Sequence, residues 1–425
     1  MILLLFAALA VFIVIGLPIA LALAGASLVY VLASGTVPPL VVVHRMVAGV
    51  DSFPLLAIPF FIFAGNLMNS TGITARIFAF AQALVGWMRG GLGHVNVGAS
   101  VLFAGMSGAA VADAGGLGAI EIKAMRDAGY DPDFSIGITA ASSTIGPLIP
   151  PSLPMVIYGV LASASIGQLF AAGVIPGLLM AVALMILVHF YARRRGYRRA
   201  AAFSMRVLWI TFRRAFLSLI TPAIIIGGIL LGIMTPTEAA IGAVAWALIL
   251  GAVIYRNLTL KSFLRISLES LETTVVIMFV VASASIFSWI LTQNRVPEMF
   301  AALVSGSTDN TFVILVVINL ILFVVGCFME TVAAITILVP VLLPLAISVG
   351  VDPVQFGVIM VLNLMLGLLT PPVGMVLYIL AKVSNVSFEY TARATMPFIV
   401  PLLVVLMMVT FIPALSMWLP TLIYR

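Results

Sequence analysis

Charge is scarce in this sequence. Charged residues make up 8% of the 425 residues, hydrophobic residues make up 63%, and the mean hydropathy is +1.29. A soluble globular domain carries about a quarter charged residues, so the composition excludes a soluble globule. Apolar runs of about 20 residues, long enough to cross a bilayer as a helix, recur along the chain. The sequence therefore predicts an all-α, polytopic membrane protein embedded in a lipid bilayer.

Cysteine and histidine are also scarce, which excludes several kinds of site. Cys327 is the single cysteine, so no internal disulfide is possible. The three histidines, His44, His94 and His189, are too scattered for a metal cage. An HExxH motif, a Walker A motif and a nucleophile elbow are all missing, so the sequence predicts neither an enzyme nor an ATP-driven pump. The net charge of +6 reflects membrane topology, and we expect no nucleic-acid partner.

The basic residues that are present gather between the two halves of the chain. Cytoplasmic loops of membrane proteins are enriched in Lys and Arg, so the segment that links the two halves is predicted to be cytoplasmic. A second basic segment contains Arg256, Lys261 and Arg265 and is expected on the same side. The two halves would then cross the membrane in opposite directions, as in an inverted repeat. The link contains eight arginines: Arg193, Arg194, Arg195, Arg198, Arg199, Arg206, Arg213 and Arg214.

The halves are related by duplication. Residues 105–151 align without a gap to residues 326–372, and helix-breaking residues fall in register. The alignment pairs Asp131-Pro132 with Asp352-Pro353 and Pro150-Pro151 with Pro371-Pro372. Matching Gly and Pro breaks in two halves of a membrane protein are the best sequence indication of a secondary transporter's binding site.

Each repeat reads as a hairpin followed by a broken helix. A re-entrant hairpin exposes backbone amides and carbonyls at membrane depth, which is tolerated only where they line a cavity. Proline lacks an amide hydrogen and clashes with the preceding turn, so the Pro-rich segments must interrupt their helices. In the first repeat we expect hairpin arms at 91–105 and 114–128 around a tip at 107–110, and a break at 146–151. In the second we expect an arm at 311–325, a tip at 326–332, and a break at 367–372.

These interruptions are the candidate binding sites. Unwound carbonyls and helix C-termini suit Na⁺, whereas helix N-termini suit a carboxylate. The candidate Na⁺ ligands are Ser107, Gly108, Gly146 and Pro147 at the first site and Gly326, Glu330, Gly367 and Thr370 at the second. The candidate substrate-binding residues are Asp113, Ser143, Thr144, Asn363, Pro151 and Pro372.

Other interpretations of these residues stay open at this point. The glycines could serve only close helix packing, and the hydroxyls could bond back to their own helices or act between helices. Asp113 and Glu330 are acids in apolar surroundings, where an ionisable group is a functional candidate by default. They could ligate a cation, carry a coupling proton, or pair with a nearby donor.

The chain resembles a known family over essentially its whole length, and three stretches carry the resemblance. They are Phe53–Pro59 with Ala64–Met68, Phe103–Gly108, and Gly357–Met360 with Thr370–Gly374. These stretches are similar to the large membrane subunit of TRAP (tripartite ATP-independent periplasmic) transporters. The chain departs from the family pattern at Ala109, Ala110 and Asp113, so backbone ligation of the first cation is favoured over side-chain ligation.

The resemblance implies an elevator-type transporter of the bacterial inner membrane. It would use two or more Na⁺ ions to import an organic acid, such as sialic acid, a C4-dicarboxylate, or a 2-oxo or sugar acid. Its partners would be a small four-helix membrane subunit and a periplasmic receptor protein. The expected divisions are scaffold helices and an arm (1–90), a first transport-domain half (91–192), an Arg-rich linker (193–216), a second scaffold and arm (217–308), and a second transport-domain half (309–425).

Two other functions remain as alternatives. A stand-alone Na⁺/dicarboxylate symporter of a related two-hairpin fold would transport without a receptor. A membrane-embedded scaffold or channel would lack a saturable cycle coupled to a gradient.

Overall fold

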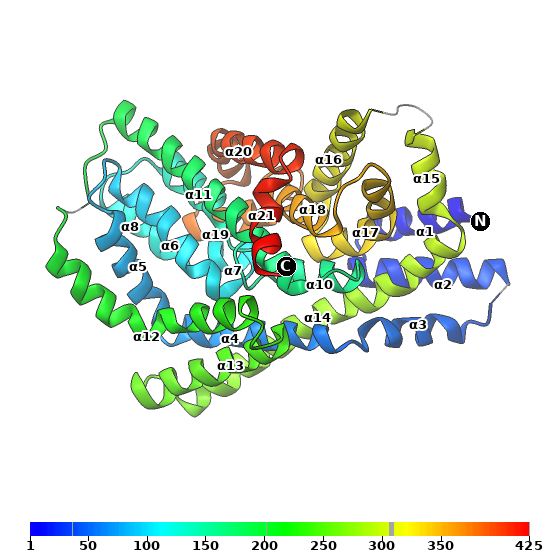
Figure 1. The fold of residues 1–425 in the computed structure, drawn as a ribbon, viewed down its shortest axis with the longest axis horizontal. Helices are drawn as coiled ribbons and strands as arrows, with labels where there is room; N and C mark the ends of the chain where they lie inside the picture. Colours follow the sequence, from blue (N-terminus) through cyan, green and yellow to red (C-terminus); the bar gives the residue numbers. More distant parts are fainter. Residues whose placement is uncertain (36, 201, 306–309, 425) are drawn as a thin grey trace.

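The structure, a computed structural model, describes residues 1–35, 37–200, 202–305 and 310–424, with only the backbone of Ser107, Val304 and Ser305. The described chain is helical, apart from an isolated bridge between Arg89 and Arg199 (Figure 1). Eight of its helices are long and apolar enough to cross a membrane. The prediction of an all-α, polytopic membrane protein is confirmed.

The first half of the chain runs from α1 to α11. Its N-terminal helices are α1 (Ile2–Val14), α2 (Ile19–Ser34), α3 (Leu40–Val50), the 3₁₀-helix η1 (Phe53–Leu56), α4 (Ala57–Ser70) and α5 (Ile73–Val85). Then follow α6 (Gly91–Ser107), α7 (Ala110–Gly115), α8 (Leu117–Asp127), α9 (Pro132–Ser143), α10 (Leu153–Leu161) and α11 (Ile166–Arg195).

The second half runs from α12 to α21. It begins with α12 (Met205–Leu230), α13 (Pro236–Leu248), the π-helical segment η2 (Ile249–Ile254), α14 (Leu260–Gln293) and α15 (Val296–Ser305). It ends with α16 (Thr311–Phe328), α17 (Thr331–Ser348), α18 (Pro353–Gly367), α19 (Met375–Ser384), α20 (Phe388–Phe411) and α21 (Ala414–Ile423).

The duplication extends well beyond the segment that aligns by sequence. In the register that pairs Gly105 with Gly326, α9 falls on α18, α10 on α19 and α11 on α20. The same register carries α5 onto α15, and it carries α3, η1 and α4 together onto the single long helix α14. Both halves are therefore built from one plan, and the second half replaces a bent arm by one continuous helix.

Both broken helices lie where the prolines predicted them. Pro132 and Pro353 start α9 and α18 at the first turn, where a missing amide hydrogen costs nothing. After each helix ends, a Pro-Pro pair, with a cis bond in both repeats, precedes the next helix. The Ser152 hydroxyl caps α10 by accepting from the Met155 amide at 3.2 Å, whereas α19 starts after Gly374, at φ +51°. The predicted interruptions are confirmed.

The two halves interlock through these broken helices. α9 packs against α20 of the other half, and its counterpart α18 packs against α11. A Cβ atom on Gly137 would lie 2.4 Å from the Ala394 carbonyl oxygen, so a residue without a side chain lets α9 and α20 approach this closely. Next to this contact, the Phe134 and Phe398 rings meet edge to face at 5.8 Å.

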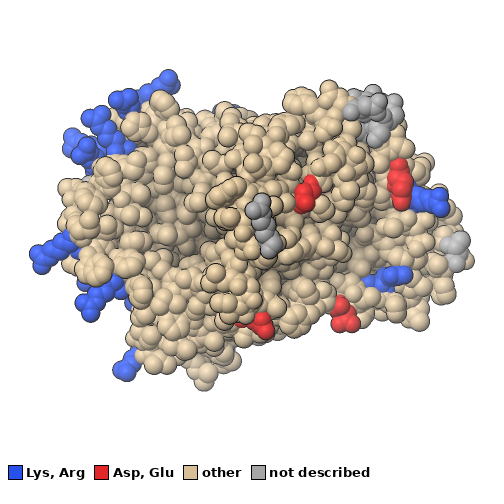
Figure 2. All heavy atoms as spheres, viewed as in Figure 1, with Lys and Arg blue, Asp and Glu red and all other residues tan. Residues whose placement is uncertain are grey.

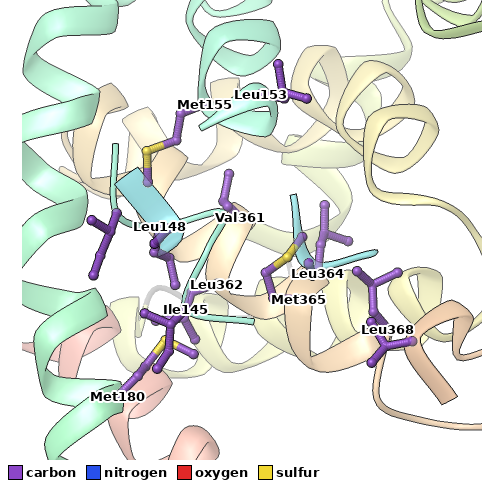
Figure 3. Close-up of a cluster of buried hydrophobic side chains, with 14 of the residues drawn as sticks. Ile145, Leu148, Leu153, Met155, Met180, Val361, Leu362, Leu364, Met365 and Leu368 are labelled. Carbon is purple, nitrogen blue, oxygen red and sulfur yellow. The ribbon is translucent and has the colours of Figure 1, made fainter. Parts of the chain in front are cut away.

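Apolar side chains fill the space between the breaks. In Figure 3, Ile145 and Leu148 of the first break are drawn with Val361, Leu362 and Met365 of α18 in one buried cluster. All of these side chains are almost completely buried. Lipid tails are as apolar as these side chains, so inside a bilayer the contacts stabilise the breaks through close van der Waals packing. The interruptions are thus held by a packed core and are not loose loops.

Most of the basic residues visible in Figure 2 collect at its left end, where α8 and the link between α11 and α12 lie, and a few lie at the right. The link is anchored at the left end by Arg195, which pairs with Asp131 at 3.0 Å and with Asp133 at 2.7 Å. Tyr197 also donates to Asp131 at 2.6 Å. Burial and this hydrogen bond raise the pKa of Tyr197 to about 12, so its hydroxyl remains a donor at physiological pH. The anchor fixes the start of α9.

Candidate substrate and cation site

A cavity of about 670 Å³ lies between two arm helices, α4 and α14, and two helical hairpins. The first hairpin is formed by α6, α7 and α8, and the second by α16 and α17. One wall comes from α4 and α14, which pack against each other. The opposite wall comes from the turns of both hairpins and from the edges of both breaks. Its main contributors are Ala109–Ala112 and Pro147, Leu153 and Pro154 in the first repeat, and Glu330–Val332, Leu368 and Met375 in the second.

The lining of the cavity is mostly apolar, with a few convergent polar groups. Such a combination is typical of a small-molecule site. Lys and Arg are missing from the described lining, so an anion would rely on amide groups and helix N-termini. The polar lining residues are Asn66 and Asn69 on α4, Glu272 and Thr273 on α14, and Glu330 and Thr331 at the second hairpin.

The first hairpin turns at Gly108. Its φ of +60° is a left-handed conformation that favours glycine, and a Cβ there would lie 2.4 Å from the Pro151 carbonyl oxygen. The Gly108 carbonyl accepts a hydrogen bond from the Leu153 amide at 3.4 Å. The tip therefore rests directly on the first break, and Ala109 leaves it in an extended conformation before α7 begins.

The second hairpin meets its break in a similar way. A Cβ on Gly367 would lie 2.4 Å from the carbonyl carbon of Gly326, so the two backbones touch. The Cys327 carbonyl accepts from the Val373 amide at 3.1 Å. In both repeats a hairpin carbonyl thus accepts one backbone hydrogen bond from the residues that follow the break.

Glu330 occupies the turn of the second hairpin and caps α17. One of its carboxylate oxygens accepts from the Val332 amide at 2.8 Å and from the Ala333 amide at 3.2 Å. A carboxylate at a helix N-terminus is stabilised by the helix dipole. Because Glu330 already holds this N-terminus, an anionic ligand would have to use another one. The N-terminus of α19, which also borders the cavity at Met375, has no side-chain cap.

The structure brings part of the predicted set together. Pro147 and Glu330 line the cavity, and the glycines at 108, 146, 326 and 367 lie at the tips and breaks beside it. The Thr370 hydroxyl donates to the Leu366 carbonyl at 2.9 Å. The Ser107 side chain lies outside the described part of the structure. Whether these residues ligate Na⁺ stays a prediction.

The predicted substrate-binding residues lie outside the lining of this cavity. Ser143 and Thr144 are buried and donate to carbonyls of their own helix, at 2.8 and 2.6 Å. Asn363 donates to the side chain of Asn319 at 2.8 Å. Pro151 is buried, whereas its counterpart Pro372 is exposed. Their part in binding substrate stays a prediction.

Asp113 lies on α7, one residue beyond the cavity wall. The wall includes Val111 and Ala112, whereas the Asp113 side chain is 2% exposed. Its carboxylate therefore faces the interior of the first half. It shares that environment with Glu121 on α8, which the sequence analysis did not single out.

The arm side of the cavity was missed by sequence reasoning. Asn66, Asn69, Glu272 and Thr273 come from segments about 200 residues apart, far from the repeat that drew attention. A signal was present, because polar residues inside an apolar span are expensive and often functional. Asn66 also gains a fixed orientation by donating to Ser270 on α14 at 2.9 Å, which joins the two arm helices.

Comparison with known proteins places this architecture in a family. The model for the tripartite ATP-independent periplasmic transporter, DctM component, matches residues 6–415. The sialic acid TRAP transporter large permease protein SiaM of Vibrio cholerae is 48% identical over 96% of this chain and 95% of that protein. The isethionate TRAP transporter permease protein DctMQ of Oleidesulfovibrio alaskensis is 41% identical over 97% of this chain, which spans 65% of its length.

A solved structure supports the fold independently. The YdaH transporter of Alcanivorax borkumensis superposes with a TM-score of 0.67, covering 89% of this chain and 88% of that one, at 12% sequence identity. At this identity the likeness shows the fold alone. The family match covers nearly the whole chain, and the close relatives are permeases rather than enzymes. The chain belongs to the DctM family, the large permease component of TRAP transporters.

Proposed function

We propose that this chain is the large membrane subunit of a Na⁺-coupled, receptor-dependent transporter that imports small organic acids. The observation that carries this proposal is the cavity between α4 and α14 on one side and both hairpin turns and both breaks on the other. A site formed where two repeats meet is typical of secondary transporters. The substrate would occupy this cavity, and the cations would occupy the tips and breaks beside it.

Charge in the cavity explains why cations would bind together with the substrate. Glu272 and Glu330 both line it, and the described lining contains no basic side chain. An anionic substrate alone would add a further negative charge to this partly desolvated space, which is unfavourable. A Na⁺ ion at the second hairpin, next to Glu330, would offset that charge. The substrate carboxylate would then lie at the uncapped N-terminus of α19, with Asn66 and Asn69 facing it from the arm.

The substrate class follows from the relatives and from this chemistry. One relative is named for sialic acid, a carboxylic acid, and another for isethionate, a sulfonic acid. Both are small organic anions, and the cavity volume suits a molecule of that size. We therefore propose a small organic acid, with sialic acid as the first compound to test.

The partners are proposed from the family. This chain spans 65% of DctMQ, which leaves room in that relative for the small membrane subunit as a fused segment. We propose such a subunit as a partner of this chain. A periplasmic receptor would deliver the substrate to the end of the molecule opposite the basic residues. We propose that the protein lies in the bacterial inner membrane, with the basic end in the cytoplasm.

Apolar side chains on the two facing walls of the cavity support an elevator mechanism. The arm helices contribute Val276, Ile277 and Val280 to the wall, and the hairpin side faces them with Val332 and Met375. Apolar side chains lose few directional contacts when two surfaces slide past each other. We propose that α6–α11 and α16–α21 form the moving part and that α4, α13 and α14 form the fixed part. The two hairpins would be re-entrant in the membrane.

The test is uptake of labelled sialic acid and other organic acids into proteoliposomes. The vesicles would contain this chain and its small subunit, with or without receptor protein and with or without an inward Na⁺ gradient. We expect uptake only when both receptor and gradient are present. A K⁺ gradient of equal size is the matched ionic control.

Two outcomes would contradict the proposal. Gradient-driven uptake without receptor would indicate a stand-alone symporter. Non-saturable flux of the label that ignores the Na⁺ gradient would indicate a channel.

A further inference from the structure

Inside the first half lies a pair of buried acids that the proposed function does not use. Asp113 on α7 is 2% exposed and Glu121 on α8 is 1% exposed. The two carboxyl groups are close enough to repel each other electrostatically. Both Asp113 oxygens and the Oε1 atom of Glu121 lack a hydrogen-bond partner within the described chain. An ionised carboxylate buried in this way is costly unless a cation or a proton compensates it.

The donors near Glu121 are already in use. The Asn96 amide nitrogen donates to Glu121 Oε2 at 2.6 Å and to Thr139 Oγ1 at 2.7 Å. Ser142 in turn donates to Asn96 Oδ1 at 2.7 Å. This chain of hydrogen bonds from α9 through α6 to α8 orients one oxygen of Glu121. It supplies no donor to Asp113, and the side-chain donor close to that carboxyl group is the Ser100 hydroxyl on α6.

No basic side chain neutralises the pair. Among the described residues, the salt bridges involve only Arg195 with Asp131 and Asp133, and Arg265 with Glu269. The helices packed against α7 are α6, α8, α9 and α19. Besides Glu121, their titratable and charged groups are His94 on α6, Lys123, Arg126 and Asp127 on α8, Asp133 on α9, and the exposed Tyr378 and Lys382 on α19.

These groups do not offset the charge of the pair. Lys123, Arg126 and Lys382 are exposed, and Asp133 is engaged by Arg195. His94 is buried, but its electrostatic partner is His189. Without a basic side chain against the pair in the described chain, a proton bound by the pair itself would offset its charge.

We propose that Asp113 and Glu121 share one exchangeable proton, which is released when a coupling cation binds at the first hairpin. Asp113 lies directly behind the cavity wall formed by Ala110–Ala112, so a cation at the tip would be close to its carboxyl group. Two carboxyl groups that repel each other bind and release their protons as a coupled pair. A nearby positive charge stabilises the doubly ionised form, so the O–H bond breaks and the proton passes to water. The inference rests on the proposed Na⁺ coupling.

Thermodynamic linkage makes this proposal measurable in two ways. If Na⁺ binding releases the proton, a higher proton concentration must weaken Na⁺ binding by the same coupling. In weakly buffered solution, adding NaCl to the purified complex of this chain with its small subunit should release about one proton per complex. The Na⁺ concentration that gives half-maximal uptake should rise several-fold between mildly alkaline and mildly acidic pH.

The variants Asp113→Asn and Glu121→Gln test the assignment. In Asp113→Asn the acid behind the tip is absent, so we expect proton release and the pH dependence of Na⁺ half-saturation to be lost. In Glu121→Gln only the repulsion is absent, so we expect both to weaken. Glu121→Gln keeps an oxygen acceptor for the Asn96 amide, so it provides the test if Asp113→Asn fails to fold. The matched control is Asp127→Asn, an exposed acid on the same helix, which should behave as the unmodified chain.

Three results would overturn the inference. Na⁺-driven uptake without proton release would refute the proposed release of a proton and leave the proposed transport function intact. Lower Na⁺ cooperativity in Asp113→Asn, again without proton release, would assign the pair to a metal cation. Equal proton release from Asp127→Asn and Asp113→Asn, each below that of the unmodified chain, would place the titrating group elsewhere. Absence of any Na⁺-dependent uptake would instead refute the proposed function itself.

Discussion

The substitution Gly367→Ala tests whether contact between the second hairpin and its break is needed for cation binding. A Cβ at residue 367 would lie 2.4 Å from the carbonyl carbon of Gly326 and 2.6 Å from its Cα and carbonyl oxygen. All three atoms are backbone, so no flexible side chain can move aside. Carbon atoms pack at about 3.5 Å or more, so α16 and α18 must separate locally by about 1 Å.

The magnitude follows from two opposing terms. Overpacking of this kind costs about 1–3 kcal/mol, whereas replacing glycine by alanine in a helix gains at most about 1 kcal/mol. The gain is smaller here because Gly367 is the last residue of α18. If the separation falls on the cation site, a loss of about 1–3 kcal/mol weakens Na⁺ binding about 5- to 150-fold.

The assay is Na⁺-dependent uptake in proteoliposomes, combined with thermal unfolding of the purified complex. We expect a higher half-saturating Na⁺ concentration for Gly367→Ala and a lower Tm. The matched control is Gly227→Ala in α12, where a Cβ meets no atom within 4 Å, so its Tm should rise or stay unchanged. An unchanged Na⁺ dependence and Tm in Gly367→Ala would mean that cation binding does not need this contact between hairpin and break.

Two further predictions concern other parts of the molecule. Glu330→Gln keeps an acceptor for the Val332 amide but removes the charge. Half-maximal uptake should then require about tenfold more Na⁺, a loss of ~1.4 kcal/mol in Na⁺ binding. The control is Glu298→Gln at an exposed position on α15, and equal behaviour of the two variants would contradict a role for Glu330. Gly49→Ala would place a Cβ 2.3 Å from the Ser285 Cβ and separate α3 from α14, which should lower the Tm of the purified complex by an amount equivalent to about 1–3 kcal/mol. Adding Ser285→Gly should restore much of that Tm, and no recovery would mean that the clash lies elsewhere.

The interruptions of the fold could be predicted because their cause is local. Pro147, Pro150 and Pro151 lack the amide hydrogen that a helix needs, whatever surrounds them, and the same holds for Pro371 and Pro372. The observed helices end and restart within a few residues of the expected positions. Because both halves carry matching breaks, the helices on either side of one break could be aligned with those on either side of the other.

The side chains at the site were harder to predict, because their direction depends on packing. Ser143 and Thr144 precede the first break as expected, yet both point to carbonyls of their own helix. Asp113 follows the first tip, yet it faces inward toward Glu121, away from the cavity. A hairpin of known sequence can present either face to its neighbours, and only the neighbouring helices decide which.

The membrane environment, the duplication and the positions of the breaks could all be deduced from the sequence. Each of these follows from composition or from backbone chemistry that acts within a few residues. In contrast, the folded structure was needed to show that α4 and α14 close the cavity and that Glu330 caps α17 inside it. These facts depend on contacts between segments hundreds of residues apart, which no local pattern encodes.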